Sequence, residues 1–147
     1  MIRAAQEKDI EQLTVFLQEL FSIEEDFCFN FALQKKGLQL LMQNPSSAIL
    51  VAEQDGQPVG MVTGQLTIST AEGTTALLVE DLFVAVPYRK KKIATSLLQE
   101  LGSWAFKNGA SRMQLLADKN NESALEFYHK DGWQSTQLVC LRKYHKE

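Results

Sequence analysis

The sequence has 147 residues, of which 45% are hydrophobic and 22% charged, and this balance predicts one globular domain over residues 1–147. The net charge of −3 gives no general attraction to nucleic acid or to a membrane surface, so neither partner is expected. Two cysteines and two histidines offer neither a disulfide framework nor a metal cluster. No apolar run approaches the ~20 residues that span a bilayer, and the charged N-terminus is unlike a signal peptide. A cytoplasmic location is expected.

Hydrophobic periodicity divides the chain into strand and helix segments. The predicted elements, in chain order, are a strand over 2–5, helices over 8–21 and 31–43, strands over 48–52, 59–68 and 75–86, a helix over 91–107, a strand over 113–116, a helix over 122–130, and strands over 133–136 and 138–142. Asp55-Gly56 predicts a tight hairpin, and Asn108-Gly109 predicts the end of a helix. Strand 75–86, the longest, reaches strand 113–116 through a helix, so these two strands should be parallel. The order predicts an α/β fold, a mixed sheet with helices packed on it.

Four basic residues stand together where the helix over 91–107 begins. They are Arg89, Lys90, Lys91 and Lys92. A helix N-terminus carries partial positive charge and unpaired N–H groups, and no Ser, Thr, Asp or Asn precedes the first turn as a cap. These features favour an anion such as a pyrophosphate at this point. The alternative is a solvated basic turn on a surface helix.

Two adjacent carboxylates interrupt an apolar strand. Glu80 and Asp81 lie between the apolar triplets 77–79 and 82–84, and neighbouring side chains of a strand point to opposite faces. At least one carboxylate is therefore expected in an apolar environment, where burial raises its pKa toward the range of a general base. The alternative is an ion pair with a nearby Arg or Lys.

The last predicted helix carries a second group of polar side chains. Asn121 is expected to cap it, and Tyr128 can supply a phenolic proton. His129 has only His145 as a companion, so a histidine-rich zinc site is not expected. A half-buried structural tyrosine is the alternative reading of Tyr128.

The order and spacing of these motifs resemble the GCN5-related N-acetyltransferase (GNAT) family. Residues 79–98, V-E-D-L-F-V-A-V-P-Y-R-K-K-K-I-A-T-S-L-L, resemble that family's strand followed by Arg/Gln-x-x-Gly-x-Gly/Ala. Residues 121–133 match its N-x-x-A-x-x-F-Y-x-x-x-G-F/W segment at every fixed position. The resemblance implies a mixed, mostly antiparallel central sheet, a parallel strand pair splayed at the acetyl-CoA site, and helices on both faces.

The resemblance also implies a reaction, the direct transfer of an acetyl group from the co-substrate acetyl-CoA to a primary amine. Tyr128 matches the family's general acid. Glu80 matches the catalytic glutamate of polyamine-acetylating members, with Asp81 as the fallback. The implied cofactor ligands are Leu82, Phe83 and Val84 for the pantetheine arm, Arg89, Lys90, Lys91, Lys92, Ile93, Ala94 and Thr95 for the pyrophosphate, and Asn121 and Ser123 on the other side of the cofactor.

One position departs from the family pattern. Lys92 stands where the family usually has glycine, whose missing Cβ lets a pyrophosphate approach the backbone. Position 92 is expected to be helical, which needs no positive φ, and the Lys92 amine can itself reach a phosphate. The departure keeps open a second function, that of a non-catalytic acyl-CoA-binding module.

The connection between the first two helices is the candidate acceptor rim. Three acidic residues are followed by three aromatic ones: Glu24, Glu25, Asp26, Phe27, Phe29 and Phe31. This pattern suggests a cation-attracting rim with aromatic walls, suited to a polyamine, a lysine-like amine or an aminoglycoside. The alternative is a solvated turn followed by core phenylalanines. A small-molecule amine is the expected acceptor, with a protein lysine or N-terminus as the alternative, and a homodimer is a further expectation from the family.

Overall fold

The computed structural model describes residues 1–23 and 29–145. The chain divides into two compact units, unit 1 (Met1–Leu115) and unit 2 (Leu116–Glu147). Unit 1 contains the sheet, and unit 2 contains helix α4 (Glu122–Lys130). That residues 1–147 form a single domain stays a prediction.

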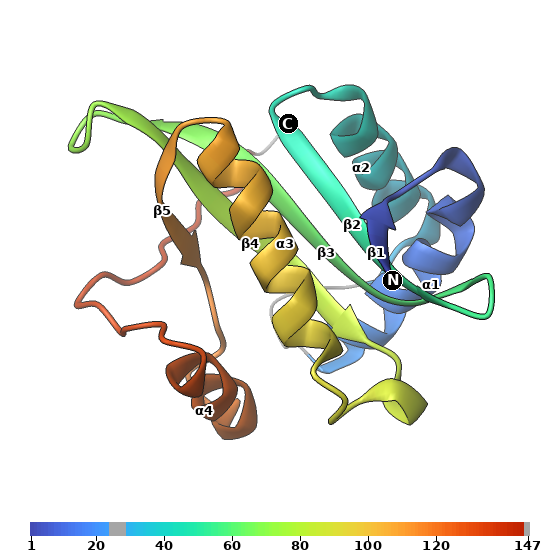
Figure 1. The fold of residues 1–147 in the computed structure, drawn as a ribbon. Coiled ribbons are helices and arrows are strands. Elements are labelled where there is room, and N and C mark those ends of the chain that lie inside the picture. The colour runs from blue at the N-terminus through green and yellow to red at the C-terminus, as the bar shows by residue number, and fades with distance from the viewer. Residues whose placement is uncertain (24–28, 146–147) are drawn as a thin grey trace. The chain divides into compact units, whose positions relative to one another are not determined.

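Within the described residues, a five-stranded sheet in the order β1-β2-β3-β4-β5 forms the centre of unit 1 (Figure 1). Its strands are β1 (Ile2–Ala4), β2 (Ser47–Gln54), β3 (Gln57–Ser69), β4 (Thr74–Val84) and β5 (Ala110–Leu115). Neighbouring strands are antiparallel except β4 and β5, which are parallel. The expected mixed, mostly antiparallel sheet with one parallel pair is confirmed.

The lengths of β3 and β4 correct the strand predicted over 75–86. β4 has 11 residues and ends at Val84, whereas β3 has 13 residues and is the longest strand described. The chain then forms a 3-10 helix, η2 (Val86–Tyr88), because Pro87 has a fixed φ and no N–H to continue a ladder. The predicted hairpin between β2 and β3 is confirmed, since Asp55 and Gly56 have φ of 52° and 77°, as a two-residue turn requires.

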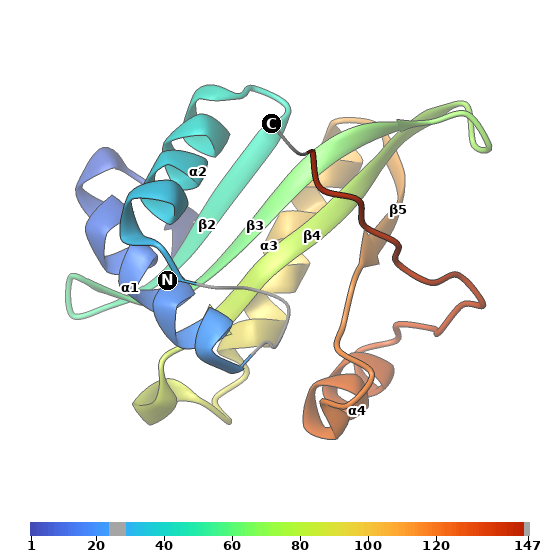
Figure 2. The ribbon, with the colours of Figure 1, turned by 180° about the vertical axis from the view of Figure 1, so that it is seen from behind.

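Helices cover both faces of this sheet, as expected. α3 (Ile93–Lys107) lies over the face seen in Figure 1, and α1 (Ile10–Ile23) and α2 (Phe31–Gln43) lie over the face seen in Figure 2. A short 3-10 helix, η1 (Glu7–Asp9), takes up the first residues of the helix predicted over 8–21. None of the described helices combines the length and apolarity needed to cross a bilayer.

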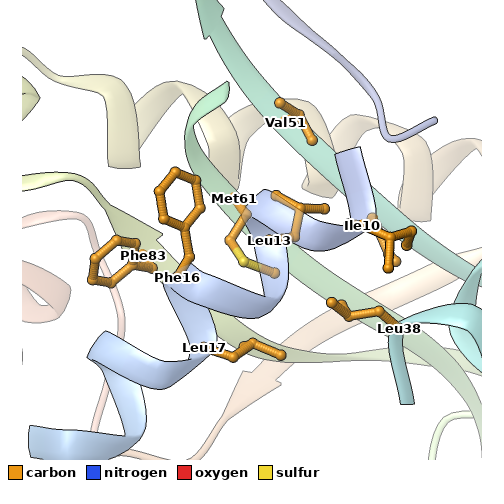
Figure 3. Packing of buried hydrophobic residues seen from close by; sticks show 9 residues of the cluster. Ile10, Leu13, Phe16, Leu17, Leu38, Val51, Met61 and Phe83 are labelled. Atoms are coloured by element: carbon orange, nitrogen blue, oxygen red, sulfur yellow. The ribbon is translucent and has the colours of Figure 1, made fainter. Parts of the chain in front are cut away.

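The face under α1 and α2 holds a buried apolar cluster, part of which is shown in Figure 3. Its buried members are Ile10, Leu13, Phe16, Leu17, Leu38, Ile49, Val51, Met61 and Phe83. The ring centroids of Phe16 and Phe83 are 5.1 Å apart, which links α1 directly to the end of β4. Full burial of a Phe or Leu side chain contributes about 1.5–3 kcal/mol, so the cluster holds α1 against this part of the sheet.

The opposite face depends on two glycines of β3. A Cβ on Gly64 would lie 2.9 Å from Leu77 Cδ1 and 3.0 Å from Leu101 Cδ2. A Cβ on Gly60 would lie 3.1 Å from the carbonyl oxygen of Phe83. Since Leu101 belongs to α3 and is fully buried, the missing side chains set how closely α3 approaches the sheet.

We predict that Gly64→Ala lowers the free energy of unfolding by about 1–3 kcal/mol, because the added methyl group overlaps two buried leucines. Gly37→Ala in α2 is the matched control. A Cβ there meets nothing within 4 Å, and alanine in a helix interior is about 0.5–1 kcal/mol more favourable than glycine. Urea unfolding of both variants measures the difference. Equal stability of the two variants would contradict close packing at position 64.

Unit 2 confirms one predicted helix and corrects two predicted strands. α4 has the predicted bounds, and Gly132 follows it with φ of 97°. The strands expected over 133–136 and 138–142 are not formed among the described residues, and Leu138 and Leu141 are 82% and 89% exposed. A strand needs hydrogen-bonded neighbours, and an isolated hairpin is at best marginally stable. Strand-forming residues alone therefore do not make a strand here.

Candidate functional site

β4 has a free edge beyond the point where β5 leaves it. The described ladder between β4 and β5 ends with Val79 opposite Leu115, whereas the ladder between β4 and β3 continues to Val84. Residues 81–84 therefore have no ladder partner on β5, and their edge can pair with another extended chain. This divergence was expected for the parallel pair, and it includes the segment 82–84, which is predicted to pair with a pantetheine arm.

A loop joins the end of β4 to α3, and Arg89 ties this loop to the strand. The Arg89 Nε donates a hydrogen bond of 2.7 Å to the carbonyl oxygen of Val84. The guanidinium carbon lies 5.3 Å from the centroid of the Phe83 ring, within the range of a cation–π contact. Part of the Arg89 side chain is therefore engaged with β4, and its role as a phosphate ligand stays a prediction.

The three lysines after Arg89 correct the predicted start of the helix. Lys90 and Lys92 have φ of 64° and 63°, in the left-handed region, and α3 begins only at Ile93. The predicted start at Lys91 and the helical conformation expected at position 92 are therefore wrong. The physical reason is the turn itself: Arg89 is extended, and the left-handed Lys92 redirects the chain into the helix.

The first turn of α3 offers backbone donors to an anion. Lys92 makes no side-chain cap, and an early intrahelical bond runs from the Ser96 N–H to the Lys92 carbonyl oxygen. The N–H groups of residues 93–95 precede this bond, and the first turn holds no acidic side chain. Together with the helix dipole and the basic loop, these donors fit a pyrophosphate. The φ of Lys92 lies in the left-handed region, which glycine adopts most readily.

The two carboxylates of β4 do not alternate as they would in a regular strand. A bulge places Asp81 and Leu82 opposite the single residue Val62 of β3, and Asp81 takes φ of 50°. The Thr63 hydroxyl donates a hydrogen bond of 2.8 Å to Asp81 Oδ2, and Thr63 is also the register partner of Glu80. Directly opposed residues lie on the same face of a sheet. The prediction that the two carboxylates point to opposite faces is therefore wrong, since both lie beside one threonine.

Asp81 is the carboxylate that the structure places in an apolar environment. Its side chain is partly buried, whereas Glu80 is exposed. Burial raises the pKa of Asp81, and the hydrogen bond from Thr63 opposes part of that rise. Asp9 is buried in the same unit, but its bonds of 2.7 and 2.9 Å from Arg3 hold the pKa of Asp9 below its usual value. A β4 carboxylate with a raised pKa, as expected from the sequence, is thus found at Asp81.

The acceptor rim predicted between the first two helices is described only in part. Residues 24–28, which include its three acidic side chains, lie outside the described residues. Phe29 and Phe31 make an edge-to-face contact with ring centroids 6.4 Å apart, and Phe31 is 43% exposed. Phe31 is therefore not a core phenylalanine, and the hypothesis of an aromatic rim stays open at this position.

Unit 2 holds the remaining predicted site residues. Asn121 caps α4 through its side chain, as predicted, and also accepts a hydrogen bond of 3.4 Å from the Ser123 hydroxyl. Tyr128 is partly buried and makes edge-to-face contacts with Phe127 and Trp133, at centroid distances of 5.4 and 6.0 Å. The predicted site residues are divided between the two units, and their assembly into one site stays a prediction.

A shallow depression of about 290 Å³ lies beside the start of α3. It is lined by Met1, Ile2, Ala52, Glu53, Gln54, Val59, Lys91, Ile93, Ser96 and Glu100. Of the predicted site residues it includes Lys91 and Ile93, and its Glu53 is already paired with Arg3 at 2.9 Å. Over residues 1–23 and 29–145, no three His, Cys, Asp or Glu side chains are grouped as metal ligands.

Sequence reasoning missed Thr63, the buried hydrogen-bond partner of Asp81. A threonine within an apolar strand carries no distinguishing signal, because β-branched residues are common in strands. The bulge was missed because it is set by the pairing of two strands rather than by a local pattern. Its effect is to bring a β3 hydroxyl to a β4 carboxylate 18 positions later in the chain.

We predict that Lys92→Gly raises the free energy of unfolding by about 0.5–1 kcal/mol, because a left-handed conformation strains every residue except glycine. Lys91→Gly is the control, since it removes the same charge at a position without a positive φ. Thermal unfolding of both variants, compared with the wild type, measures the effect. A lower midpoint for Lys92→Gly than for Lys91→Gly would be inconsistent with strain at position 92.

Comparison with known sequences identifies relatives over most of the chain. A model of the "Acetyltransferase (GNAT) family" matches residues 13–133. "Uncharacterized N-acetyltransferase MJ1207" of Methanocaldococcus jannaschii is 27% identical over 134 residues, covering 88% of this chain and 59% of that protein. "Uncharacterized N-acetyltransferase YhfO" of Bacillus subtilis is 29% identical over 97 residues, covering 66% of this chain and 65% of that protein. The matches thus span less than two thirds of the length of either relative.

Solved structures share the fold at low sequence identity. A structure titled as a possible acetyltransferase from Clostridium difficile 630 has a TM-score of 0.88 and 18% identity, covering 100% of this chain and 98% of that one. A structure titled as AAC(6')-Iy in complex with the bisubstrate analog CoA-S-monomethyl-acetylneamine has a TM-score of 0.83 and 17% identity, with 99% and 98% covered. At these identities the likeness establishes the fold alone.

Proposed function

The chain belongs to the acetyltransferase (GNAT) family, and from this premise we propose that it transfers an acetyl group from acetyl-CoA to a primary amine. The observation that carries the proposal is the end of β4. A strand edge that β5 has left leads, through a basic loop, to an uncapped helix N-terminus. The unpaired edge of β4 suits an extended arm that contains amide groups, and the N-terminus of α3 suits the phosphates attached to that arm.

The binding roles follow from this geometry and from the family resemblance. Leu82, Phe83 and Val84 pair with the pantetheine arm through their backbone. The N–H groups of residues 90–95 hold the pyrophosphate, with the lysine side chains adding positive charge. Asn121 and Ser123 of unit 2 line the other side of the cofactor. Acetyl-CoA supplies the reactive thioester.

The chemistry needs one base and one acid. An alkyl amine with a pKa of ~10.4 is protonated at pH 7, and removing its proton costs roughly 4–5 kcal/mol. Glu80, which the resemblance favours, or Asp81 takes this proton. The amine nitrogen then attacks the thioester carbonyl carbon, the C–S bond breaks, and Tyr128 gives a proton to the departing thiolate. The products are the acetamide and CoA.

The acceptor is proposed to be a small amine. Both sequence relatives carry the name N-acetyltransferase, and AAC(6')-Iy is titled in complex with the bisubstrate analog CoA-S-monomethyl-acetylneamine. A protein lysine or N-terminus is the alternative acceptor, and a homodimer stays a prediction. A non-catalytic acyl-CoA-binding module remains the second function, and the Cβ that Lys92 carries in place of the family's glycine is the main argument for it.

Calorimetric titration with acetyl-CoA, with adenosine as the control ligand, tests the cofactor. We expect micromolar binding that adenosine does not reproduce, because the backbone donors and cations act on the phosphates. Lys92→Gly is expected to keep or improve this affinity. Release of free CoA on addition of amines then tests transfer. Equal binding of adenosine and acetyl-CoA, or no binding at all, would reject the proposed cofactor site.

We predict that Tyr128→Phe lowers the turnover number by about 10²–10⁴-fold and leaves the acetyl-CoA affinity within about twofold, because only proton donation is lost. Tyr144→Phe is the matched control, since Tyr144 is 71% exposed and has no proposed role. Initial rates of CoA release and calorimetry provide the two measurements. Unchanged turnover in Tyr128→Phe would exclude this tyrosine as the acid.

A further inference from the structure

Asp81 occupies a backbone conformation that its surroundings must enforce. It lies in the β4 bulge with φ of 50°, where non-glycine residues are strained and Asp and Asn are tolerated best. A bulge redirects a side chain relative to a regular strand, and bulges are frequent beside active sites. Here the redirected group is a carboxylate that reaches the hydroxyl of Thr63, itself 1% exposed.

Among residues 1–23 and 29–145, the interactions given for Asp81 include no countercharge. Burial raises the pKa of Asp81 and the hydrogen bond from the Thr63 hydroxyl lowers it, and neither effect comes from a charged group. α1 packs on this side of the sheet, and the residues that it buries are all uncharged: Ile10, Leu13, Thr14, Phe16 and Leu17. Glu80, the ionisable group next to it along the chain, carries the same sign. Asp9 shows the contrasting arrangement, with a guanidinium bonded to both carboxylate oxygens.

The position of Asp81 along β4 also suits a base that acts beside the thioester. It follows the last β4–β5 pair by two residues and directly precedes segment 82–84, to which the pantetheine arm is assigned. A base that takes a proton from an attacking amine must lie within hydrogen-bond reach of that amine, beside the thioester. Among the β4 residues beyond Val79, Asp81 combines this position with partial burial and a fixed carboxylate.

We propose that Asp81, rather than Glu80, binds the acceptor as its ammonium ion and takes the proton from it, with Thr63 as the positioning residue. The inference rests on the proposed acetyltransferase function and deepens it. The proton moves from the ammonium nitrogen to an Asp81 carboxylate oxygen, the freed lone pair forms the C–N bond, and the C–S bond breaks. The site therefore selects protonated primary amines.

Asp81→Asn is the first test, and the protein itself provides a matched control. Asparagine tolerates the left-handed conformation and can still accept the Thr63 hydrogen bond. Asp55→Asn makes the same change at a residue with φ of 52° in the exposed β2–β3 hairpin. The assay is CoA release with spermidine, a lysine derivative and an aminoglycoside as probe acceptors. We expect kcat/KM to fall about 10²–10⁴-fold in Asp81→Asn, at least tenfold more than in Glu80→Gln, with Asp55→Asn at the wild-type rate.

A stability measurement separates this role from a structural one. The folded-state pKa of Asp81 is raised, so ionising Asp81 favours the unfolded chain, and stability falls as pH rises from about 3.8 through the raised pKa. Asp81→Asn removes this cost. We therefore expect its thermal midpoint at pH 7 to equal or exceed that of the wild type while its activity collapses. A lower midpoint together with the activity loss would assign Asp81 to structure and overturn the proposal.

The pH dependence tests Thr63. Only the ionised Asp81 can accept a proton, so kcat/KM falls on the acid side as Asp81 becomes protonated. Removing the Thr63 hydroxyl removes an interaction that lowers the pKa of Asp81, so Thr63→Val should move the acid limb to higher pH. Thr63→Ser keeps a hydroxyl and should return the limb toward its wild-type position. An acid limb that stays in place in Thr63→Val overturns the positioning role.

The outcomes distinguish this inference from the proposed function. If the wild type releases CoA and Glu80→Gln loses as much activity as Asp81→Asn or more, the base is Glu80 and the inference fails alone. If the wild type releases no CoA with any probe amine, the proposed transfer fails and the inference fails with it. Acetyl-CoA calorimetry on the same samples then shows whether the protein binds the cofactor without transferring its acetyl group.

Discussion

One asymmetry in strand pairing determines where this protein can act. β4 remains hydrogen-bonded to β3 up to Val84 but loses β5 after Val79. A strand that keeps one neighbour stays ordered, while the groups along its other edge become available. The apolar cluster anchors the half-paired end through Phe83, which packs on Phe16 of α1. The bulge follows directly after this divergence, and the basic loop (89–92) and the start of α3 at Ile93 come next along the chain.

Among the described residues of unit 1, two aspartates are buried or partly buried, and they show how surroundings give one residue type different tasks. Asp9 is held by a guanidinium and a backbone N–H, so its charge is neutralised within the fold. Asp81 is held by a hydroxyl, which fixes the carboxylate but leaves its charge uncompensated by that partner. A carboxylate held by a hydroxyl, like that of Asp81, adds little to the stability of the fold. Such a carboxylate therefore points to a chemical role rather than a structural one.

Local signals in the sequence predicted the fold well. Asp55-Gly56, Asn108-Gly109 and Asn121 act through their own backbone preferences, and the structure places each as expected. The family expected from two motifs is confirmed by the match over residues 13–133. The features that could not be predicted from the sequence depend mostly on pairing between segments that are distant along the chain.

The β4 bulge and the contact between Thr63 and Asp81 arise from the register of two strands, which no single segment encodes. The left-handed Lys92 overrides the preference of a lysine-rich stretch for helix, because the chain must change direction before α3. The C-terminal segment has strand-forming residues, but a β-strand exists only where another strand accepts its hydrogen bonds.

The contacts of Arg89 have a kinetic consequence. Its bond to the Val84 carbonyl and its position over the Phe83 ring involve neutral partners, which orient the guanidinium without cancelling its charge. The loop therefore keeps a concentrated positive field in a chain whose net charge is −3. Such a field draws polyanions from solution along a preferred direction and raises their association rate at low ionic strength. Added salt screens this attraction over a Debye length of about 10 Å at 0.1 M, so the salt dependence of capture should exceed that of release.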